Sequence, residues 1–223
     1  MDLPSQPDIC WSRGVPVSRT YDDPYFSRRG GLEESRHVFL AGNDLPTRLK
    51  DGFHVAELGF GTGRNLLALA QLWQEVQGHG TIRYTGFEAQ PLAAPDMAAA
   101  LALFRDLAPL AESLVGQWRQ GKHRMELAGI SATIIIGDAA QTLPLWQDKA
   151  DAWFLDGFAP SRNPEMWTDD LMAEIFRHTA QGGTFATYTA AGHVRRALAA
   201  AGFNVTRRPG FAGKKHMSVG LLE

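Results

Sequence analysis

Short apolar segments alternate with helix-like stretches along residues 51–223, and this alternation limits the folds open to the chain. The apolar or β-branched segments, which we predict to be strands, are 53–58, 82–88, 132–137, 152–155 and 184–188. The predicted helices are 65–74, 93–104, 107–118, 169–178 and 193–201. This alternation predicts an α/β fold with a mostly parallel sheet that is covered on both faces.

The pattern changes at both ends of the chain. Residues 204–208 and 216–222 have the composition of two strands around a Pro-Gly turn, which predicts a C-terminal antiparallel hairpin joined to the sheet. Nearer the start, we expect a short hairpin over 9–18 and a helix near 32–40. Since no repeat or low-complexity linker divides the chain, we expect one domain over 51–223 with residues 1–50 as an extension packed on it.

The composition of the chain excludes several classes of protein. The 223 residues, 44% of them hydrophobic, are enough to bury a sizeable core. Cys10 is the single cysteine, which excludes an internal disulfide and a cysteine-built metal site, and we expect no metal. Polar and proline residues interrupt any signal peptide near Met1, and no apolar run has the length of a membrane span. We therefore expect a cytoplasmic protein that does not associate with membranes.

A glycine-rich turn follows the first predicted strand, in the segment Gly59-Phe60-Gly61-Thr62-Gly63. Glycines in such a turn let a ligand approach backbone that a Cβ would block. A dinucleotide fingerprint would need its third glycine at position 64, which is Arg64, so a nicotinamide dehydrogenase is disfavoured. The spacing Gly-x-Gly-x-Gly, preceded by Glu57, resembles motif I of the S-adenosylmethionine-dependent methyltransferases.

Two more acids stand at the ends of the next predicted strands. Glu88 lies 25 residues beyond Gly63, where its carboxylate suits two ribose hydroxyls, and Asp138-Ala139 follows the third strand, where an acid suits the adenine amino group. Taken singly, an acid at a strand end is more often a helix cap or a solvated residue. Three in register after a motif-I turn favour a bound S-adenosylmethionine.

The fourth predicted strand ends in the most informative segment, DAWFLDGFAPSRNPEMW at 151–167. Its Asp156 and Phe158 resemble the polar-Pro-Pro-aromatic motif of amino-group methyltransferases, in which the polar group binds the amine and the aromatic ring stacks on the base. We expect Asp156 to orient the amine and pass its proton to water, although a carboxylate also raises the pKa of a nearby amine. The alternative is a strand-to-loop turn capped by its own aspartate.

The segment 151–168 also resembles, more closely, the methyltransferase domain of the bifunctional tRNA-modification family that makes 5-methylaminomethyl-2-thiouridine (MnmC), or its stand-alone relatives. Segments 16–46, 57–65 and 182–217 resemble the same family. The resemblance implies a Rossmann-like class I methyltransferase with a seven-stranded sheet. It implies methyl transfer from S-adenosylmethionine to 5-aminomethyl-(2-thio)uridine at the tRNA wobble position. It also implies an FAD-dependent oxidase acting on the same nucleoside, fused or separate; no sequence for one follows Glu223.

Charge is distributed unevenly along the chain. Residues 175–223 carry seven Lys or Arg against Glu223 alone, whereas residues 1–174 have an excess of acids. This bias predicts a surface for a polyanion, here a tRNA anticodon stem-loop, although a solvated face without a partner is an equal alternative. The predicted phosphate contacts are Arg195, Arg196, Arg207, Arg208, Lys214 and Lys215, and the candidates around the base are Phe158, Pro160, Trp167, Tyr25 and Phe26.

Other functions stay open on the sequence alone. A polyamine-type aminopropyltransferase would use a similar sheet and similar strand-end acids, but gives no reason for the basic C-terminal third. An RNA-binding module that has lost turnover is the second alternative, and the intact acids argue against it. Residues 22–27 either fold over the cofactor as a lid or cover a sheet edge.

Overall fold

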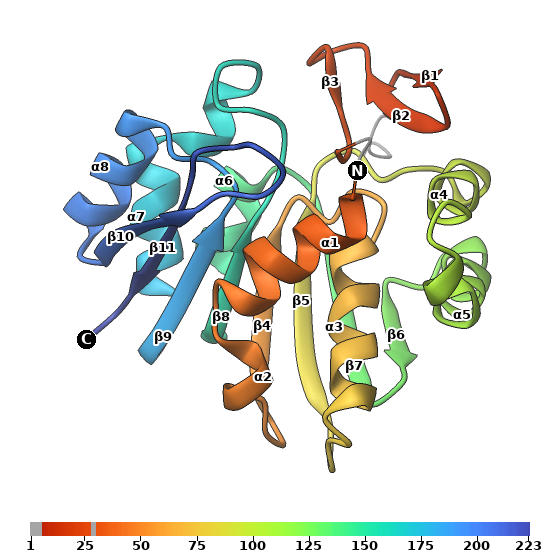
Figure 1. Cartoon of the computed structure of the whole chain (residues 1–223), viewed down its shortest axis with the longest axis horizontal. Helices are drawn as coiled ribbons and strands as arrows, with labels where there is room; N and C mark the ends of the chain where they lie inside the picture. The colour runs from red at the N-terminus through yellow and green to blue at the C-terminus, as the bar shows by residue number, and fades with distance from the viewer. Residues whose placement is uncertain (1–5, 28–29) are drawn as a thin grey trace.

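The structure is a computed structural model and describes residues 6–27 and 30–223. In this part of the chain, an eight-stranded sheet forms the centre (Figure 1), in the order β10-β11-β9-β8-β4-β5-β7-β6. Its strands are β4 (His54–Leu58), β5 (Ile82–Glu88), β6 (Arg124–Leu127), β7 (Ile130–Ile136), β8 (Ala150–Leu155), β9 (Thr179–Thr187), β10 (Asn204–Pro209) and β11 (His216–Leu221). The five strands from β9 to β7 pair in parallel, and β10–β11 is an antiparallel hairpin. The predicted α/β fold class is thereby confirmed.

The predicted number of seven strands is wrong, because β6 adds an eighth. This strand pairs antiparallel with β7 at the edge of the sheet, with Leu127 opposite Ile130. It has only four residues, Arg-Met-Glu-Leu, in which exposed charged and buried apolar residues alternate. So short an alternating segment carries little strand signal in the sequence.

Helices cover both faces of the sheet (Figure 1). On one face lie α1 (Gly31–Ser35), α2 (Leu45–Arg48) and α3 (Arg64–Glu75); on the other lie α6 (Ala139–Thr142), α7 (Asp169–Arg177) and α8 (Gly192–Ala201). The remaining helices, α4 (Ala94–Leu101) and α5 (Ala108–Arg119), lie beside β6. The helix predicted near 32–40 is α1 followed by a π-helical segment, Arg36–Ala41.

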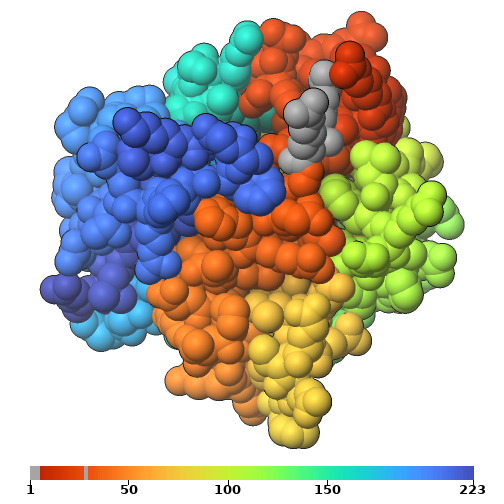
Figure 2. Space-filling model, viewed as in Figure 1, coloured from red at the N-terminus to blue at the C-terminus, as the bar shows by residue number. Residues whose placement is uncertain are grey.

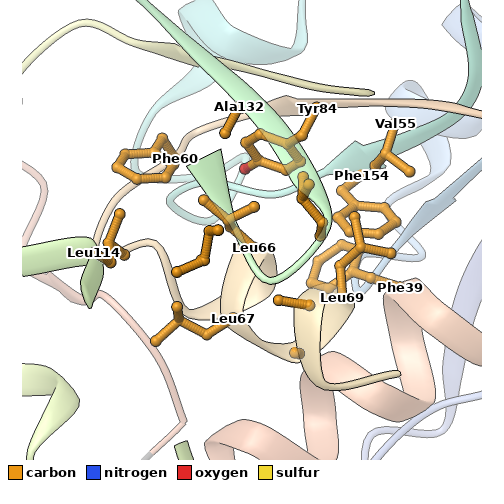
Figure 3. Close-up of a cluster of buried hydrophobic side chains, with 14 of the residues drawn as sticks. Phe39, Val55, Phe60, Leu66, Leu67, Leu69, Tyr84, Leu114, Ala132 and Phe154 are labelled. Atoms are coloured by element: carbon orange, nitrogen blue, oxygen red, sulfur yellow. The ribbon is translucent and has the colours of Figure 1, made fainter. Parts of the chain in front are cut away.

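Two apolar cores result from the alternation of side chains along the strands. In β8, Trp153 packs on the side of α7 and α8, while its neighbour Phe154 packs on the side of α3. Figure 3 shows the α3-side core, where Leu66 of α3 lies among Phe39, Val55 and Phe154. Both faces of the central strands are thus buried, which accounts for their nearly continuous apolar sequences.

A separate small sheet lies above the carboxyl ends of the central strands (Figure 1). Its strands β1 (Ile9–Ser12), β2 (Val15–Ser18) and β3 (Asp23–Pro24) are antiparallel, which confirms the predicted N-terminal hairpin. Within residues 6–27 and 30–223, no helix is both long and apolar enough to cross a membrane.

Candidate active site

A pocket opens where the carboxyl ends of β4, β5, β7 and β8 meet the segment after β2. Eight of the predicted site residues line it: Tyr25, Gly59, Gly61, Glu88, Asp138, Ala139, Asp156 and Phe158. Because the strands are parallel, their carboxyl ends lie at one edge of the sheet, and side chains that are far apart in sequence become neighbours.

The glycine turn forms one wall of the pocket. Gly59 has a φ of +78°, and a Cβ on it would lie 2.9 Å from the backbone oxygen of Asp156. This position therefore requires glycine both for its conformation and for its contact with the loop after β8. Phe60, Thr62 and Gly63 do not line the pocket. The Phe60 ring lies in the core (Figure 3), and its centroid is 5.5 Å from that of the Trp118 ring.

Glu88 ties the glycine turn to the end of β5. Its carboxylate accepts hydrogen bonds from the N–H groups of Gly61 (2.7 Å) and Gln90 (2.8 Å), one on each oxygen. Burial raises the pKa of Glu88 above its usual value. Glu88 lines the pocket, and its carboxylate has acceptor capacity beyond these backbone donors for a ligand hydroxyl.

Asp138 is both a helix cap and a pocket residue. One carboxylate oxygen accepts from the N–H of Ala140 at 2.9 Å and caps α6. The residue nevertheless lines the pocket, as does Ala139. The cap and the ligand contact, which the sequence presented as alternatives, are compatible because a carboxylate has two oxygens.

Glu57 lies behind the pocket rather than in it, which corrects the expectation that it contacts the cofactor. The side chain is fully buried and accepts hydrogen bonds from the amide of Asn65 and the hydroxyl of Tyr84. Burial and the neighbouring Asp156 carboxylate raise the pKa of Glu57 well above its usual value. Its position indicates a supporting role, holding α3 against β4 and β5.

Asp156 lies in the pocket at the end of β8, held by three donors. The N–H of Gly157 donates to one oxygen at 2.8 Å, and the side chains of Asn65 (2.8 Å) and Arg64 (3.5 Å) reach the other. Burial raises the pKa of Asp156, and Arg64 opposes that increase. Arg64, which excluded a dinucleotide fingerprint, is thus the buried counter-ion of this carboxylate.

Aromatic side chains frame the mouth of the pocket. The Phe158 ring stacks on Tyr21 with centroids 4.7 Å apart and meets Tyr25 edge-on at 5.1 Å. Asp23 accepts from the N–H of Ala159 at 2.8 Å, so the segment after β2 is fastened to the loop after β8. This segment lies over the pocket and forms a small sheet of its own rather than covering the edge of the main one.

Three predicted substrate residues are buried away from the pocket. Trp167 is 3% exposed, and its indole N–H donates to the backbone oxygen of Phe158 at 3.0 Å, so it supports the loop instead of contacting a base. Pro160, in the same loop, is buried. Phe26 packs against Phe104 in a small core cluster.

The predicted basic residues do not form one free surface. Lys214 is paired with the buried Glu34 at 2.8 Å and lies over the ring of Tyr188, and Arg208 is paired with Asp44 at 3.2 Å. Successive residues of β10 face opposite sides of the sheet, so Arg207 points away from Arg208. Val205, on the same side of β10 as Arg207, packs into the core beside α8, which carries Arg195 and Arg196. Lys215 is exposed in the β10–β11 loop. Figure 2 shows the loop between β10 and β11 lying against the α1 region, where Lys214 reaches Glu34.

Pro24 lines the pocket and belongs to the segment 22–27 that was expected as a possible lid. Sequence reasoning missed a further group of lining residues, which share no motif: Tyr21, Phe87, Ala89, Gln90, Gly137, Gly157, Asn163, Glu165, Met166 and Leu171. Several come from the 3₁₀ turn Pro164–Trp167 and the start of α7, which reach the pocket from beyond the loop after β8. The quoted segment at 151–167 contained Asn163, Glu165 and Met166, but nothing in their types marked them as pocket residues.

Comparisons with known proteins agree with this geometry. A family model described as S-adenosyl-L-methionine-dependent methyltransferase matches residues 105–223. The bifunctional tRNA 5-methylaminomethyl-2-thiouridine biosynthesis protein MnmC of Chromobacterium violaceum is 43% identical over 229 residues, which cover 98% of this chain and 35% of that protein. The protein of the same name from Pseudomonas aeruginosa is 46% identical, over 94% of this chain and 34% of its own length.

A solved structure is similar over almost the whole chain. The crystal structure of MNMC2 from Aquifex aeolicus superposes with a TM-score of 0.79 at 26% sequence identity. The match covers 98% of this chain and 71% of that one. The chain therefore spans about a third of the length of the bifunctional relatives and most of the solved one.

Proposed function

Because this chain belongs to the S-adenosyl-L-methionine-dependent methyltransferases, we propose that it methylates the primary amine of 5-aminomethyl-(2-thio)uridine at the tRNA wobble position. The product is 5-methylaminomethyl-(2-thio)uridine. The observation that carries the proposal is the match of nearly the whole chain to relatives named for that product, with Asp156 in the pocket at the end of β8. We further propose that residues 51–223 form the methyltransferase domain and residues 1–50 an extension packed on it.

The pocket fits S-adenosylmethionine, which when bound supplies a methyl group on a sulfonium ion. The turn at Gly59 and Gly61 leaves backbone open to the ligand. The Glu88 carboxylate has acceptor capacity left for a ribose hydroxyl, and Asp138 has one oxygen that does not serve as a cap. Among the described lining residues, none is Lys or Arg, which suits a cationic ligand.

Asp156 is the proposed catalytic residue. The acceptor nitrogen must be neutral to attack, with its lone pair directed at the methyl carbon. As the N–C bond forms and the C–S bond breaks, the electron pair of that bond stays on sulfur and the nitrogen becomes an ammonium. Asp156 accepts a hydrogen bond from the nitrogen, orients it, and takes up the proton it sheds before passing it to water. Because burial raises the pKa of Asp156 above that of an ordinary aspartate, it is a better base for this step.

Binding of the tRNA is proposed from the aromatic residues of the pocket and from exposed basic residues. The wobble base is already unpaired, so drawing it into the pocket costs little, and Phe158 with Tyr25 offers an aromatic wall beside Asp156. Exposed basic residues on the side of α8 and in the β10–β11 loop would contact phosphates of the anticodon stem-loop. An FAD-dependent oxidase, fused or separate, would supply the aminomethyl nucleoside in the cytoplasm.

The acids of the pocket do not by themselves exclude an aminopropyltransferase. Glu88, Asp138, Asp156 and Glu165 would also suit a polyamine. The family match favours methyl transfer over that alternative. An RNA-binding module without turnover is distinguished only by an assay.

That assay is mass spectrometry of nucleosides from tRNA lacking this methylation, after incubation with the purified chain and S-adenosylmethionine. The expected result is a shift of the aminomethyluridine peak by one methylene. No shift, with cofactor binding intact by calorimetry, would reject this substrate and keep the methyltransferase fold.

A further inference from the structure

We propose that Asn65 is a positioning residue that fixes the orientation and ionisation of Asp156 during methyl transfer. The inference rests on the proposed function, because Asp156 has a catalytic role only there. Asn65 lies in the first turn of α3, two residues after the glycine turn, and does not line the pocket.

The side-chain amide of Asn65 links two carboxylates from neighbouring strands. Its Nδ2 donates to Asp156 at 2.8 Å and to Glu57. An amide nitrogen has two hydrogens, so each carboxylate receives one and none remains. Since β4 and β8 are adjacent and parallel, this single group connects the end of one to the end of the next.

The orientation of the amide is fixed from the opposite side. The Asn65 oxygen accepts a hydrogen bond from the hydroxyl of Ser35 at 2.5 Å, and Ser35 in turn accepts from Nε of Arg64 at 2.7 Å. Ser35 is fully buried and Asn65 is 4% exposed, so water does not compete for these groups. A flipped amide would present its oxygen to two carboxylates, which makes the observed orientation the stable one.

This arrangement has two consequences for Asp156. One oxygen is held by the backbone of Gly157 and the other by Asn65, so the plane of the carboxylate is set. A hydrogen bond to the charged form also favours ionisation, against burial, which disfavours it. Without Asn65, one oxygen of the Asp156 carboxylate would lose its nearest donor, so the plane of the group would no longer be set and it would be protonated over a wider pH range.

The test compares Asn65→Leu with Asn43→Leu. Asn43 is also a buried asparagine, but it donates to the backbone oxygens of Phe39 and Trp153, away from the pocket. Three quantities are measured in the full chain: kcat and KM with tRNA bearing 5-aminomethyluridine, the Kd for S-adenosylmethionine, and the pH titration of the Asp156 carboxyl by ¹³C NMR. The Asp156 signal is assigned from its loss in Asp156→Asn.

For Asn65→Leu we expect kcat to fall by on the order of 10²-fold with the S-adenosylmethionine Kd within about twofold. The Asp156 titration and the acid limb of the pH–kcat profile should move upward by about one pH unit. Asn43→Leu should lower stability without moving either pH midpoint. If Asn65→Leu does not fold, Ser35→Ala replaces it, since it releases the amide and should shift the same quantities in the same direction by less.

A folded variant with kcat and Asp156 titration unchanged would overturn the proposal. A shifted Asp156 titration with unchanged kcat would also overturn it. So would a loss confined to the affinity for S-adenosylmethionine, because Asn65 would then support the cofactor site rather than Asp156. If the parent chain does not methylate the tRNA, the proposed function fails, while the NMR titration still reports whether Asn65 controls Asp156.

Discussion

The acids of the pocket and the basic residues of the C-terminal hairpin were both recognised from sequence, but only the acids lie together. Glu88, Asp138 and Asp156 are far apart in the chain and line one pocket. Arg207 and Arg208 are adjacent in the chain and face opposite sides of β10. Nearness in the sequence is therefore a poor guide to a shared surface, whereas register at strand ends is a good one.

The two regions also differ in how their charges are balanced. In the pocket, burial raises the pKa of Glu88 and Asp156, so these carboxylates are held ready for a cation or a proton. Beside the hairpin, Glu34 has a pKa below its usual value: burial raises it, and hydrogen bonds from Lys214 and Ser27 more than offset that increase. The pocket carboxylates can therefore still bind a cation or a proton, whereas Lys214 of the hairpin is already paired with Glu34.

The largest expected effect is that of Asp156→Asn. The amide cannot take up a proton, so we expect kcat to fall by about 10²- to 10⁴-fold while calorimetry finds the affinity for S-adenosylmethionine little changed. Release of S-adenosylhomocysteine with the modified tRNA measures the rate. If the Asn variant methylates as fast as the parent, the charge of Asp156 has no role in the mechanism. The pocket acids would then differ from the basic residues of the hairpin in position only.

The next largest effect should come from the glycine turn. Gly59→Ala places a Cβ in backbone at φ +78° and 2.9 Å from the Asp156 oxygen, so we expect at least about tenfold weaker S-adenosylmethionine binding. Gly52→Ala is the matched control, because its φ is +75° and no atom lies within 4 Å of the added Cβ. That control should cost about 1 kcal/mol of stability and leave cofactor affinity alone. Equal affinities in the two variants would mean that the contact with the loop after β8 is unimportant.

A smaller effect, on tRNA affinity, should differ between two pairs of basic residues. Replacing Arg207 and Lys215 by Gln should weaken tRNA binding severalfold and reduce the slope of log Kd against log salt by about 1.4, for two phosphate contacts at about 0.7 each. Replacing Arg208 and Lys214 should have less effect, because Asp44 and Glu34 already neutralise them. Filter binding across a salt series measures both. A larger loss in the second pair would mean that RNA displaces these acids.

The smallest effect concerns the pair Lys214–Glu34 and depends on pH. The depressed pKa of Glu34 contributes stability that is present above its unfolded value near 4.5 and is lost as the pH falls through the folded value. Since Lys214 is half exposed, Lys214→Met should destabilise by about 1 kcal/mol at pH 7 and by less at a pH well below 4.5. Lys215→Met should stay within about 0.5 kcal/mol at both. Urea unfolding at the two pH values checks this, and a loss that does not depend on pH would exclude the ion pair as its cause.

Much of the fold could be predicted because its signals are periodic. The central strands and the long helices have apolar patterns set by burial on two faces. Each of them overlaps its predicted range, and any difference lies only in where it begins or ends. The edge strand β6 was missed because four alternating residues are too few for a period. Partial burial of the edges, rather than propensity, decides such segments.

The candidate site was predictable where the backbone determines it and not where side chains do. The motif-I glycines and the strand-end acids follow from the topology. The interior position of Glu57 depends on which face of the sheet its side chain points to. The proposed role of Asn65 depends on a hydrogen-bond network that joins α1, α3 and the end of β8. No pattern in the sequence marks Asn65, since an asparagine in a first helical turn has many ordinary uses.

The contact between Gly59 and the backbone of Asp156 bears on how such an enzyme could acquire a new substrate. The turn that we propose for the methyl donor and the loop that we propose for the acceptor touch without a side chain between them, so an insertion that enlarged the loop would also displace the turn. Selection for a bulkier acceptor should therefore leave both backbones alone. It should act on Tyr21, Asp23 and Tyr25, which meet the loop through replaceable side chains, and a directed-evolution library is best placed there.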